Sequence, residues 1–436
     1  MKNLAVLLNG ASVGMLQADA RGKLAFAYTP EWRANPLATP LSLSLPLAAE
    51  KHDSDTITAV LWGLLPDNEH TLDRWARKFQ VSARNPLALL THVGEDCAGA
   101  AQFVRPERLD AILSGAEDDI TWLDEIQIAE RLKQLRQDSG AGRAPTDSGQ
   151  FSLAGAKSKT ALLYWDQRWG VPQGGIPTTH ILKPPTDDFD GYVENEYFCL
   201  QLARELGLPT PQAWVRHFGD EICFVIERYD RLEANGRLIR VHQEDFCQAL
   251  GVMPQRKYQN DGGPSPAAMA AVLREYSNTP REDLETFLLA LAFNWFIGGT
   301  DAHAKNYSLL LGEAGSTRLA PLYDLSSVLP YPRQVNIRKA TMAMRIGSHY
   351  RWWDIRPQDW LSLAAELELE REQVISVLAD TARILPDMAA GLAARVAAQD
   401  INHPVISRIV DGIADAGRRF LGALAAMQKH ASDLTT

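Results

Sequence analysis

The sequence has few cysteines and no hydrophobic run long enough for a membrane helix. Its four cysteines form no CxxC pair and lie far apart, at Cys97, Cys199, Cys223 and Cys247. They therefore indicate neither a disulfide framework nor a zinc knuckle, and a reducing cytosol fits best. The apolar stretch at residues 287–297 is well short of a bilayer span. The N-terminal apolar run ends at Asn9-Gly10, a typical hairpin turn, so we expect no signal peptide and a cytoplasmic protein.

Basic residues are outnumbered by acidic ones. The chain has 44 Lys and Arg against 54 Asp and Glu, a net charge of -10. Whole-chain electrostatics therefore exclude general attraction to nucleic acid, and only a local basic patch favours it. The ten histidines show neither an HExxH motif nor a cluster, so we expect no structural metal. The 436 residues, 46% hydrophobic and 22% charged, are typical of a soluble globular chain with two or three domains.

The pattern of apolar residues predicts an α+β protein in three parts. Residues 1–105 combine strands at 4–8, 13–16 and 24–28 with helical patterns around 57–75, which indicates a small α+β domain. Residues 106–149 form a connector, with a charged helix over 117–138 and a loop that ends near Gly149. Residues 150–436 form a mixed β lobe to about 230 and a helical lobe from about 244, which one hairpin interrupts at 307–323.

A polar loop after an apolar helix is the most informative segment. Thr279, Pro280 and Glu282 supply an N-cap, a first-turn proline and a capping-box carboxylate. Gly298 and Gly299 mark the end of this helix, and the loop TDAHAKN follows directly at 300–306. Such a loop is a good place for a functional site.

Asp301 and Asn306 are five residues apart, as in the catalytic loops of protein kinases. In that chemistry the Asp accepts the proton of the acceptor hydroxyl, and the Asn amide oxygen helps to hold Mg²⁺. Alone the spacing is a weak signal, because a turn capped by Asp and Asn explains it too. The hairpin that follows ends at Leu322-Tyr323-Asp324, where Asp324 is either a principal metal ligand or a helix N-cap before Leu325.

Upstream, the segment SLAGAKSK (residues 152–159) places Gly155 between alanines, so that backbone N–H groups are free to approach phosphates. It is not a Walker A motif, and taken alone it fits a plain hairpin loop better. Lys183 ends the strand TTHILK, where a kinase has the lysine for the α and β phosphates, or it is simply solvated. Glu194 or Glu196, on a helix over 193–206, would then pair with Lys183, and we prefer Glu196.

Residues 224–230 end the β lobe as a hinge, with the backbone at Glu227 and Tyr229 available to adenine. An ordinary strand end with a solvated Glu-Arg pair is the alternative. The chain order of phosphate loop, lysine, helix glutamate, hinge, Asp301 with Asn306 and hairpin Asp324 is that of a kinase. This order carries the kinase prediction more than any one motif.

These segments resemble the HipA-like serine/threonine kinases, the toxin component of bacterial toxin–antitoxin pairs. The resemblance covers nearly the whole chain: PLSLSLPL and NPLALL come first, then SLAGAKSKTAL, TTHILK, ENEYFCLQLARELGL, IERYDR, DGGP, TDAHAKN and LYD. It implies a protein-kinase-like bilobal fold, with ATP and Mg²⁺ as cofactors.

The resemblance also implies a role for each matching residue. Asp301 is similar to the catalytic base, Asn306 and Asp324 to the Mg²⁺ ligands, and Lys183 to the ATP phosphate contact. The implied ATP site further includes Leu153, Ala154, Gly155, Ala156, Lys157, Ser158, Lys159, Glu227, Arg228, Tyr229, His303, Lys305, Asn306, Tyr323 and Asp324.

Ser152 stands where the family has its autophosphorylated serine. A phosphate there would expel the loop and oppose ATP binding, while a plain strand-end hydroxyl is the alternative. Lys157 replaces the usual Gln of the family, which bears on this inactivation.

The implied function is a kinase toxin that phosphorylates a translation-related protein, with glutamyl-tRNA synthetase as the family-implied target. A HipB-like antitoxin would restrain it and link it to operator DNA. The alternatives are a small-molecule kinase of the aminoglycoside-phosphotransferase type and a non-catalytic corepressor. Residues 333–356 hold six Lys or Arg among Tyr350, Trp352 and Trp353, which fits nucleic-acid or phosphate contact or an acidic protein substrate. The acid-rich helix expected at 360–370 counts against direct DNA contact.

Overall fold

The computed structural model describes residues 3–138, 151–155, 157–186 and 188–433. Its contacts divide the chain into two compact units. Unit 1 holds residues 1–186, 216–257 and 308–320, and unit 2 holds 187–215, 258–307 and 321–436. The chain therefore passes between the units five times, after residues 186, 215, 257, 307 and 320. Among the described residues, no helix is both long and apolar enough to cross a membrane.

The first sheet of unit 1 has the strand order β3-β2-β1-β4. Asn9 and Gly10, with φ of 47° and 79°, form the predicted two-residue turn between β1 and β2, because such turns need positive φ at both positions. The three predicted strands are confirmed, and β4 is a fourth that the sequence pattern did not reveal. The elements of this region are β1 (Asn3–Leu8), β2 (Ala11–Ala18), β3 (Leu24–Tyr28), α1 (Pro30–Ala34), α2 (Ser54–Gly63), α3 (Glu69–Phe79), α4 (Pro86–Val93) and β4 (Ala101–Val104).

One hydrophobic core joins the first sheet to its helices. Val6, Leu16 and Phe26 from the strands pack in one cluster with Ile57 of α2 and Leu90 of α4. This burial stabilises the predicted N-terminal α+β region, and the four cysteines are buried thiols that form no disulfide.

The connector contains a strand that the sequence analysis misread. We predicted one helix over 117–138, but β5 (Ile120–Leu123) pairs with β7 and α6 (Glu125–Gln137) begins only after Asp124. The Asp124 carboxylate accepts from the Gln127 backbone N–H at 2.8 Å, and the Gln127 side chain accepts from the Asp124 N–H at 2.9 Å. This capping box fixes the start of the helix. Before β5 lie η1 (Pro106–Arg108) and α5 (Leu109–Ser114), and the predicted boundary at Gly149 falls outside the described residues.

The second sheet has the order β5-β7-β6-β8-β10-β9. Ile128 and Leu132 of α6 pack in one core with Leu162, Val171 and Leu182 from three of its strands. Its strands after β5 are β6 (Thr160–Trp165), β7 (Arg168–Pro172), β8 (His180–Lys183), β9 (Ala213–Phe218) and β10 (Glu221–Glu227), and a separate ribbon pairs β11 (Arg231–Ala234) with β12 (Arg237–Arg240).

A third sheet completes unit 1. The predicted hairpin is confirmed as β14 (Ser308–Leu311) and β15 (Thr317–Leu319), which pair antiparallel. On its other side β14 pairs with β13 (His242–Asp245), so the hairpin is built onto a strand more than 60 residues earlier. The short elements nearby are α8 (Phe246–Ala249), η2 (Pro254–Arg256) and η5 (Glu313–Gly315).

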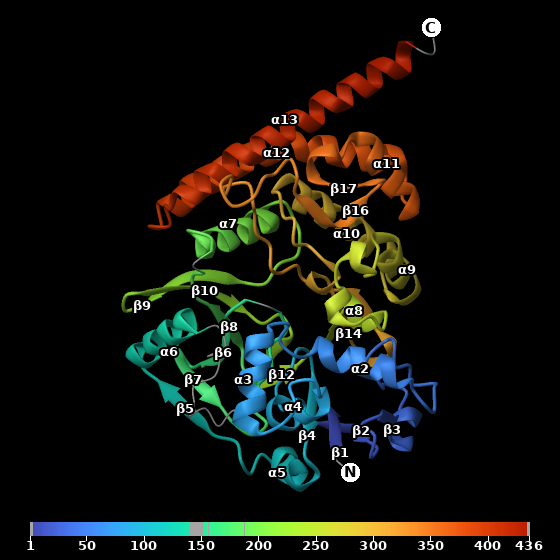
Figure 1. The fold of residues 1–436 in the computed structure, drawn as a ribbon, viewed down its shortest axis with the longest axis vertical. Helices are drawn as coiled ribbons and strands as arrows, with labels where there is room; N and C mark the ends of the chain where they lie inside the picture. Colours follow the sequence, from blue (N-terminus) through green and yellow to red (C-terminus); the bar gives the residue numbers. More distant parts are fainter. Residues whose placement is uncertain (1–2, 139–150, 156, 187, 434–436) are drawn as a thin grey trace. The chain divides into compact units, whose positions relative to one another are not determined.

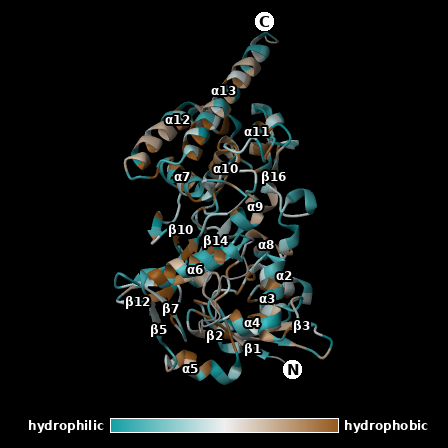
Figure 2. Ribbon diagram, turned by 60° about the vertical axis from the view of Figure 1, so that its left-hand side comes forward, coloured by the Kyte–Doolittle hydropathy of each residue, from teal (hydrophilic) through white to brown (hydrophobic). Residues whose placement is uncertain are grey.

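Unit 2 is mostly helical and centres on α10. Trp295 of this helix packs against Trp352, Trp360 and Phe420, which come from three other elements. Figure 1 shows α12 and α13 side by side, with α13 continuing to the C-terminus, and Figure 2 shows mixed hydropathy along both. The elements are α7 (Tyr192–Glu205), η3 (Gln259–Asp261), α9 (Pro266–Tyr276), α10 (Pro280–Phe296), η4 (Ala304–Asn306), β16 (Thr341–Ile346), β17 (His349–Arg351), η6 (Trp352–Asp354), α11 (Pro357–Glu366), α12 (Arg371–Ala397) and α13 (Pro404–Asp433).

The basic and aromatic segment at 333–356 contains a second hairpin, β16 with β17, where we expected only one in this half of the chain. Trp352 is buried and stacks on Trp295 with ring centroids 5.6 Å apart. The Arg419 guanidinium lies 3.7 Å from the Trp353 ring centroid. Packing within unit 2 therefore accounts for both tryptophans.

Candidate active site

Helix α10 leads into the predicted catalytic loop, and its start differs in detail from the prediction. Pro280 is the first helical residue, as predicted, but the side chain of Thr279 caps no backbone N–H, and its hydroxyl has no hydrogen-bond partner among the described residues. The Ser277 hydroxyl instead accepts from the Thr279 N–H at 3.0 Å and donates to Asp283 Oδ2 at 2.6 Å. Thr279 fails as a cap because its backbone, at φ −133° and ψ 67°, lies outside the conformation that N-caps adopt.

Two glycines turn the chain out of α10. Gly298 has φ +66°, and a Cβ atom there would lie 2.7 Å from Leu329 Cγ. A Cβ on Gly299 would lie 2.4 Å from Asn294 Oδ1. The Asn294 amide also donates to the Tyr307 hydroxyl at 3.2 Å, so the helix contacts the far end of the loop. The loop at 300–306 is thereby fixed at both ends by α10.

The five-residue spacing of Asp301 and Asn306 closes this loop. Asn306 Nδ2 donates to the backbone carbonyl of Asp301 at 3.0 Å, and the His303 N–H donates to the same oxygen at 2.8 Å. Asp301 is exposed, whereas Asn306 is buried. The turn of Asp301 and Asn306, the alternative explanation of their spacing, is therefore present, and the Asp301 side chain remains exposed.

Asp324 lies beside the loop rather than at a helix start. The Tyr323 hydroxyl donates to the Lys305 carbonyl at 2.7 Å, so the side chain next to Asp324 contacts the loop. No helix follows at Leu325, so the N-cap alternative is wrong. Asp324 has φ +57°, a conformation that is uncommon outside glycine and is retained where its surroundings enforce it, often at functional sites.

The donor set suits Mg²⁺. The Asn306 amide nitrogen is used inside the loop, while its oxygen accepts no hydrogen bond from the described residues, and Asp324 supplies a carboxylate. Within the described part of the chain, no three His, Cys, Asp or Glu side chains gather into a metal cluster. Mg²⁺ needs only one or two protein ligands when substrate phosphates and water complete its shell.

The predicted phosphate loop lies in unit 1 and is held by the N-terminal region of the same unit. Gly155 has φ +102°, and its carbonyl accepts from the Asp67 N–H at 3.2 Å. Lys159 Nζ donates to the Ala154 carbonyl at 2.6 Å, so the lysine at the end of the loop contacts the backbone near its start. Leu153 is buried, Lys157 and Ser158 are half-buried, and Ala156 lies outside the described residues.

Ser152 is completely buried at the start of this loop. Its hydroxyl donates to the Leu64 carbonyl at 2.7 Å, and its N–H donates to the Asp96 carbonyl at 2.9 Å. The predicted strand before the loop is only an isolated bridge between Phe151 and Asp96. A hydroxyl in this setting accepts a phosphoryl group only after the loop has left its seat.

Lys183 ends β8, as predicted, opposite Phe224 of β10. Its ammonium lies 5.8 Å from the Phe224 ring centroid. Glu196 lies on α7, which confirms the predicted helix, and its side chain is buried, whereas Glu194 is half-buried. Lys183 belongs to unit 1 and Glu196 to unit 2, so their ion pair stays a prediction.

The hinge segment differs from an ordinary strand end. The Arg228 N–H donates to the Thr179 carbonyl at 2.9 Å, and the Arg228 guanidinium is buried against Asp230 at 2.8 Å. The alternative of a solvated Glu-Arg pair is therefore wrong, although Glu227 itself is exposed. The Tyr229 hydroxyl donates to Gln243 Oε1 at 2.5 Å, and burial raises the pKa of Tyr229 above its ordinary value.

A buried charge cluster that the sequence pattern did not reveal joins Asp96 to the arginines at 228, 231 and 240. Asp96 accepts from Arg231 at 2.8 Å and from Arg240 at 3.3 Å. These arginines hold the pKa of Asp96 well below its ordinary range, against the opposing effect of burial, and burial lowers the pKa of Arg240 to about 10. The only sequence signal was the run of charges in IERYDR directly after an apolar strand.

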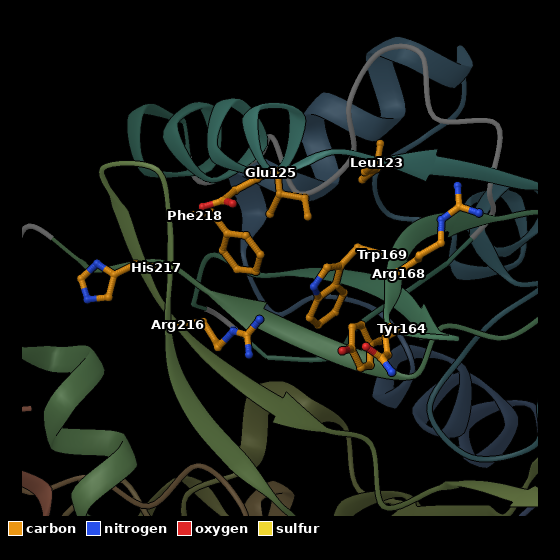
Figure 3. A pocket seen from close by; sticks show the side chains of 10 residues that line it. Leu123, Glu125, Tyr164, Arg168, Trp169, Arg216, His217 and Phe218 are labelled. Carbon is orange, nitrogen blue, oxygen red and sulfur yellow. The ribbon is translucent and has the colours of Figure 1, made fainter. Parts of the chain in front are cut away.

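A surface pocket of about 250 Å³ in unit 1 is lined by none of the predicted nucleotide residues (Figure 3). The rings of Trp169 and Phe218 meet edge to face in it, with centroids 6.0 Å apart. Its lining is Leu123, Glu125, Ile128, Tyr164, Gln167, Arg168, Trp169, Arg216, His217 and Phe218. None of these residues was predicted for the site.

Two family descriptions match this sequence. The HipA N-terminal domain matches residues 4–104, and the HipA-like C-terminal domain matches residues 151–389. The boundaries that we predicted for the connector and the two lobes stay predictions.

Curated relatives match over most of the chain. Y4mE of Sinorhizobium fredii, named as a candidate kinase, is 38% identical over 88% of this chain and 92% of its own length. The serine/threonine-protein kinase toxin HipA of Shewanella oneidensis is 29% identical over 87% of this chain and 86% of its own.

A solved structure confirms the fold. Shewanella oneidensis HipA, in a complex with HipB and operator DNA, superposes with a TM-score of 0.81 and 25% identity, over 98% of this chain and 99% of that one. The prediction of an α+β, protein-kinase-like bilobal fold is therefore confirmed. With both family descriptions and full-length relatives in agreement, this chain belongs to the HipA family.

Proposed function

We propose that this chain is an ATP- and Mg²⁺-dependent serine/threonine protein kinase that acts as a toxin. The observation that carries the proposal is the closed loop at 300–306. There the Asn306 amide holds the Asp301 backbone while the Asp301 carboxylate stays exposed. Membership of a family whose relatives are named kinases supports the same reaction.

Each group has a distinct part in phosphoryl transfer. Asp301 would orient the acceptor hydroxyl and take its proton, and Asn306 Oδ1 with Asp324 would hold Mg²⁺. When bound, this cation neutralises charge on the phosphates. Lys183 and the backbone N–H groups around Gly155 would contact the phosphates, and the backbone of Glu227 and Tyr229 would receive adenine.

Autophosphorylation at Ser152 would switch the enzyme off. Because the Ser152 hydroxyl is fully buried against the Leu64 carbonyl, a phosphate of charge near −2 cannot return to that seat. The loop would then stay displaced, and its proposed contacts with the ATP phosphates would be lost. Lys157 adds a cation to this loop where the family usually has Gln, and it would pair with the displaced phosphate.

The proposed partners follow from the relatives. The Shewanella oneidensis structure contains HipB and operator DNA, so we infer a HipB-like antitoxin that links this chain to its operator. The proposed substrate is a translation-related protein, with glutamyl-tRNA synthetase as the family-implied target, and the proposed compartment is the cytoplasm.

Intact mass spectrometry with phosphosite mapping after incubation with Mg²⁺-ATP tests the proposal. We expect one phosphate at Ser152 in the wild type and none in Asp301→Asn, in Ser152→Ala or with EDTA. Asp354→Asn, a change in a half-buried carboxylate elsewhere in unit 2, is the matched control and should retain the phosphate. ATP turnover that rises with small alcohols would favour a small-molecule kinase, and failure to bind Mg²⁺-ATP would favour a corepressor.

A further inference from the structure

The hydroxyl of Tyr258 contacts the proposed catalytic base. It donates to Asp301 Oδ1 at 2.5 Å, at the short end of hydrogen bonds to a carboxylate. The other oxygen, Oδ2, accepts no hydrogen bond from the described part of the chain, and the Asp301 side chain is exposed. One carboxylate oxygen is thus held by the protein, and the other is available to an incoming hydroxyl.

The turn that follows Tyr258 fixes its backbone. The Tyr258 carbonyl accepts from the Asp261 N–H at 3.0 Å and from the Gly263 N–H at 2.9 Å. Gly262, at φ +88°, adopts the left-handed conformation that lets the chain turn back in this way. The DGGP motif, noted in the sequence only as part of a family resemblance, therefore builds the seat of Tyr258.

The ring of Tyr258 is held as well. It meets the imidazole of His303 edge to face, with centroids 5.1 Å apart and an interplanar angle of 86°. Because His303 is buried, its imidazole gives the Tyr258 ring a well-packed contact surface. The next residue, Gln259, accepts from the Arg345 N–H of β16 at 2.8 Å, which ties η3 to the hairpin.

We propose that Tyr258 is a positioning residue for phosphoryl transfer, which holds the Asp301 carboxylate so that Oδ2 meets the acceptor hydroxyl. This inference rests on the proposed function, because it needs Asp301 to be the base. An exposed carboxylate otherwise rotates freely, and small errors in the placement of a base are costly in rate. The tyrosine acts through Asp301 and makes no contact with ATP in this role.

Tyr258→Phe removes only the donating hydroxyl. We expect the rate of phosphoryl transfer at saturating ATP to fall roughly tenfold, which corresponds to about 1.4 kcal/mol of transition-state stabilisation. The ATP concentration for half-maximal rate should stay within about twofold, because ATP contacts are untouched. Tyr276→Phe, which removes the hydroxyl of an exposed tyrosine at the end of α9, is the matched control and should leave both quantities unchanged.

A double-mutant cycle separates positioning from a merely structural role. Asp301→Asn gains no phosphate in an incubation that saturates the wild type, so its slow residual rate is followed over a much longer one. If Tyr258 acts through Asp301, adding Tyr258→Phe to Asp301→Asn should lower that residual rate no further. Independent, multiplicative losses would overturn the proposal. Full or raised activity of Tyr258→Phe would also overturn the proposal, because the hydrogen bond would then hinder Asp301 rather than position it.

A readout independent of activity distinguishes this inference from the proposed function. With 3-fluorotyrosine at position 258, Asp301→Asn should move the ¹⁹F resonance, and Asp354→Asn should not. A wild type that transfers no phosphate removes the proposed function and with it the positioning role. An active wild type whose ¹⁹F resonance ignores Asp301→Asn removes only the inference.

Discussion

Glu244 in β13 is a buried carboxyl whose charge state should set how the stability of unit 1 depends on pH. It is 1% exposed, and its oxygens accept from the Leu43 N–H at 2.8 Å and from the Ser42 hydroxyl at 2.5 Å. Burial raises the pKa of Glu244 from 4.5 to about 8, and nearby Asp245 adds to this effect. At neutral pH the folded chain therefore keeps a proton on Glu244 that the unfolded chain has released.

The sign and size of the effect follow from proton linkage. Because the pKa is raised on folding, the contribution of Glu244 is fully present below about pH 4.5, falls between pH 4.5 and about 8, and is constant above. The slope is about 1.4 kcal/mol per pH unit, so roughly 3 kcal/mol is lost between pH 5 and 7. Glu244→Gln keeps the shape, and its amide would donate to Ser42 while its oxygen accepts from Leu43.

Urea unfolding at pH 5, 6, 7 and 8 measures this effect. The free energy of unfolding of the wild type, minus that of Glu244→Gln, should fall by roughly 3 kcal/mol from pH 5 to 7, so that the variant gains on the wild type. Glu233→Gln, at an exposed position of β11, is the control and should give a difference that does not change with pH. A difference for Glu244→Gln that is equally flat would show that the buried carboxyl is ionised and refute the reasoning.

Three further changes test unit 1. Asp96→Asn should lower the free energy of unfolding by about 3–5 kcal/mol, because it leaves buried arginines without their counter-charge, and a loss below about 1 kcal/mol in urea would contradict this. Gly155→Ala should weaken ATP binding roughly tenfold in calorimetry, since φ is +102° and the new Cβ would lie 2.6 Å from Lys159 Nζ; unchanged affinity would remove the loop from the site. Thr160→Val should raise the free energy of unfolding by about 1 kcal/mol, and with it the melting temperature, because the buried Thr160 hydroxyl has no hydrogen-bond partner among the described residues. A lower melting temperature would contradict this prediction.

Local features were predictable from the sequence. The Asn9-Gly10 turn, the strand that ends at Lys183 and the loop after Gly298 each depend on residues adjacent in the chain. Their conformations follow from backbone preferences that act over a few residues. The closed loop of Asp301 and Asn306 is of the same kind, since its hydrogen bond spans five residues.

Features that depend on distant partners were not predictable. Asp96 accepts a hydrogen bond from Arg231, which lies 135 residues later in the chain, and neither local sequence predicts this partner. The strand β5 was misread as helix because its pairing with β7 outweighs the local preference of four residues. The sequence around Tyr258 contains no signal for its contact with Asp301, which lies 43 residues later in the chain.

The five passages of the chain between the two units bear on how the protein is made. Unit 1 is complete only when residues 308–320 have been synthesised, because β14 supplies the partner of β13. While the ribosome makes the 62 residues between Asp245 and Ser308, the edge of β13 that β14 will cover is unpaired. The segment TDAHAKN therefore leaves the exit tunnel before β14 can pair with β13 in unit 1. A fragment that ends before residue 320 lacks part of unit 1. Truncation and single-crossover recombination are accordingly poor ways to obtain either unit by itself.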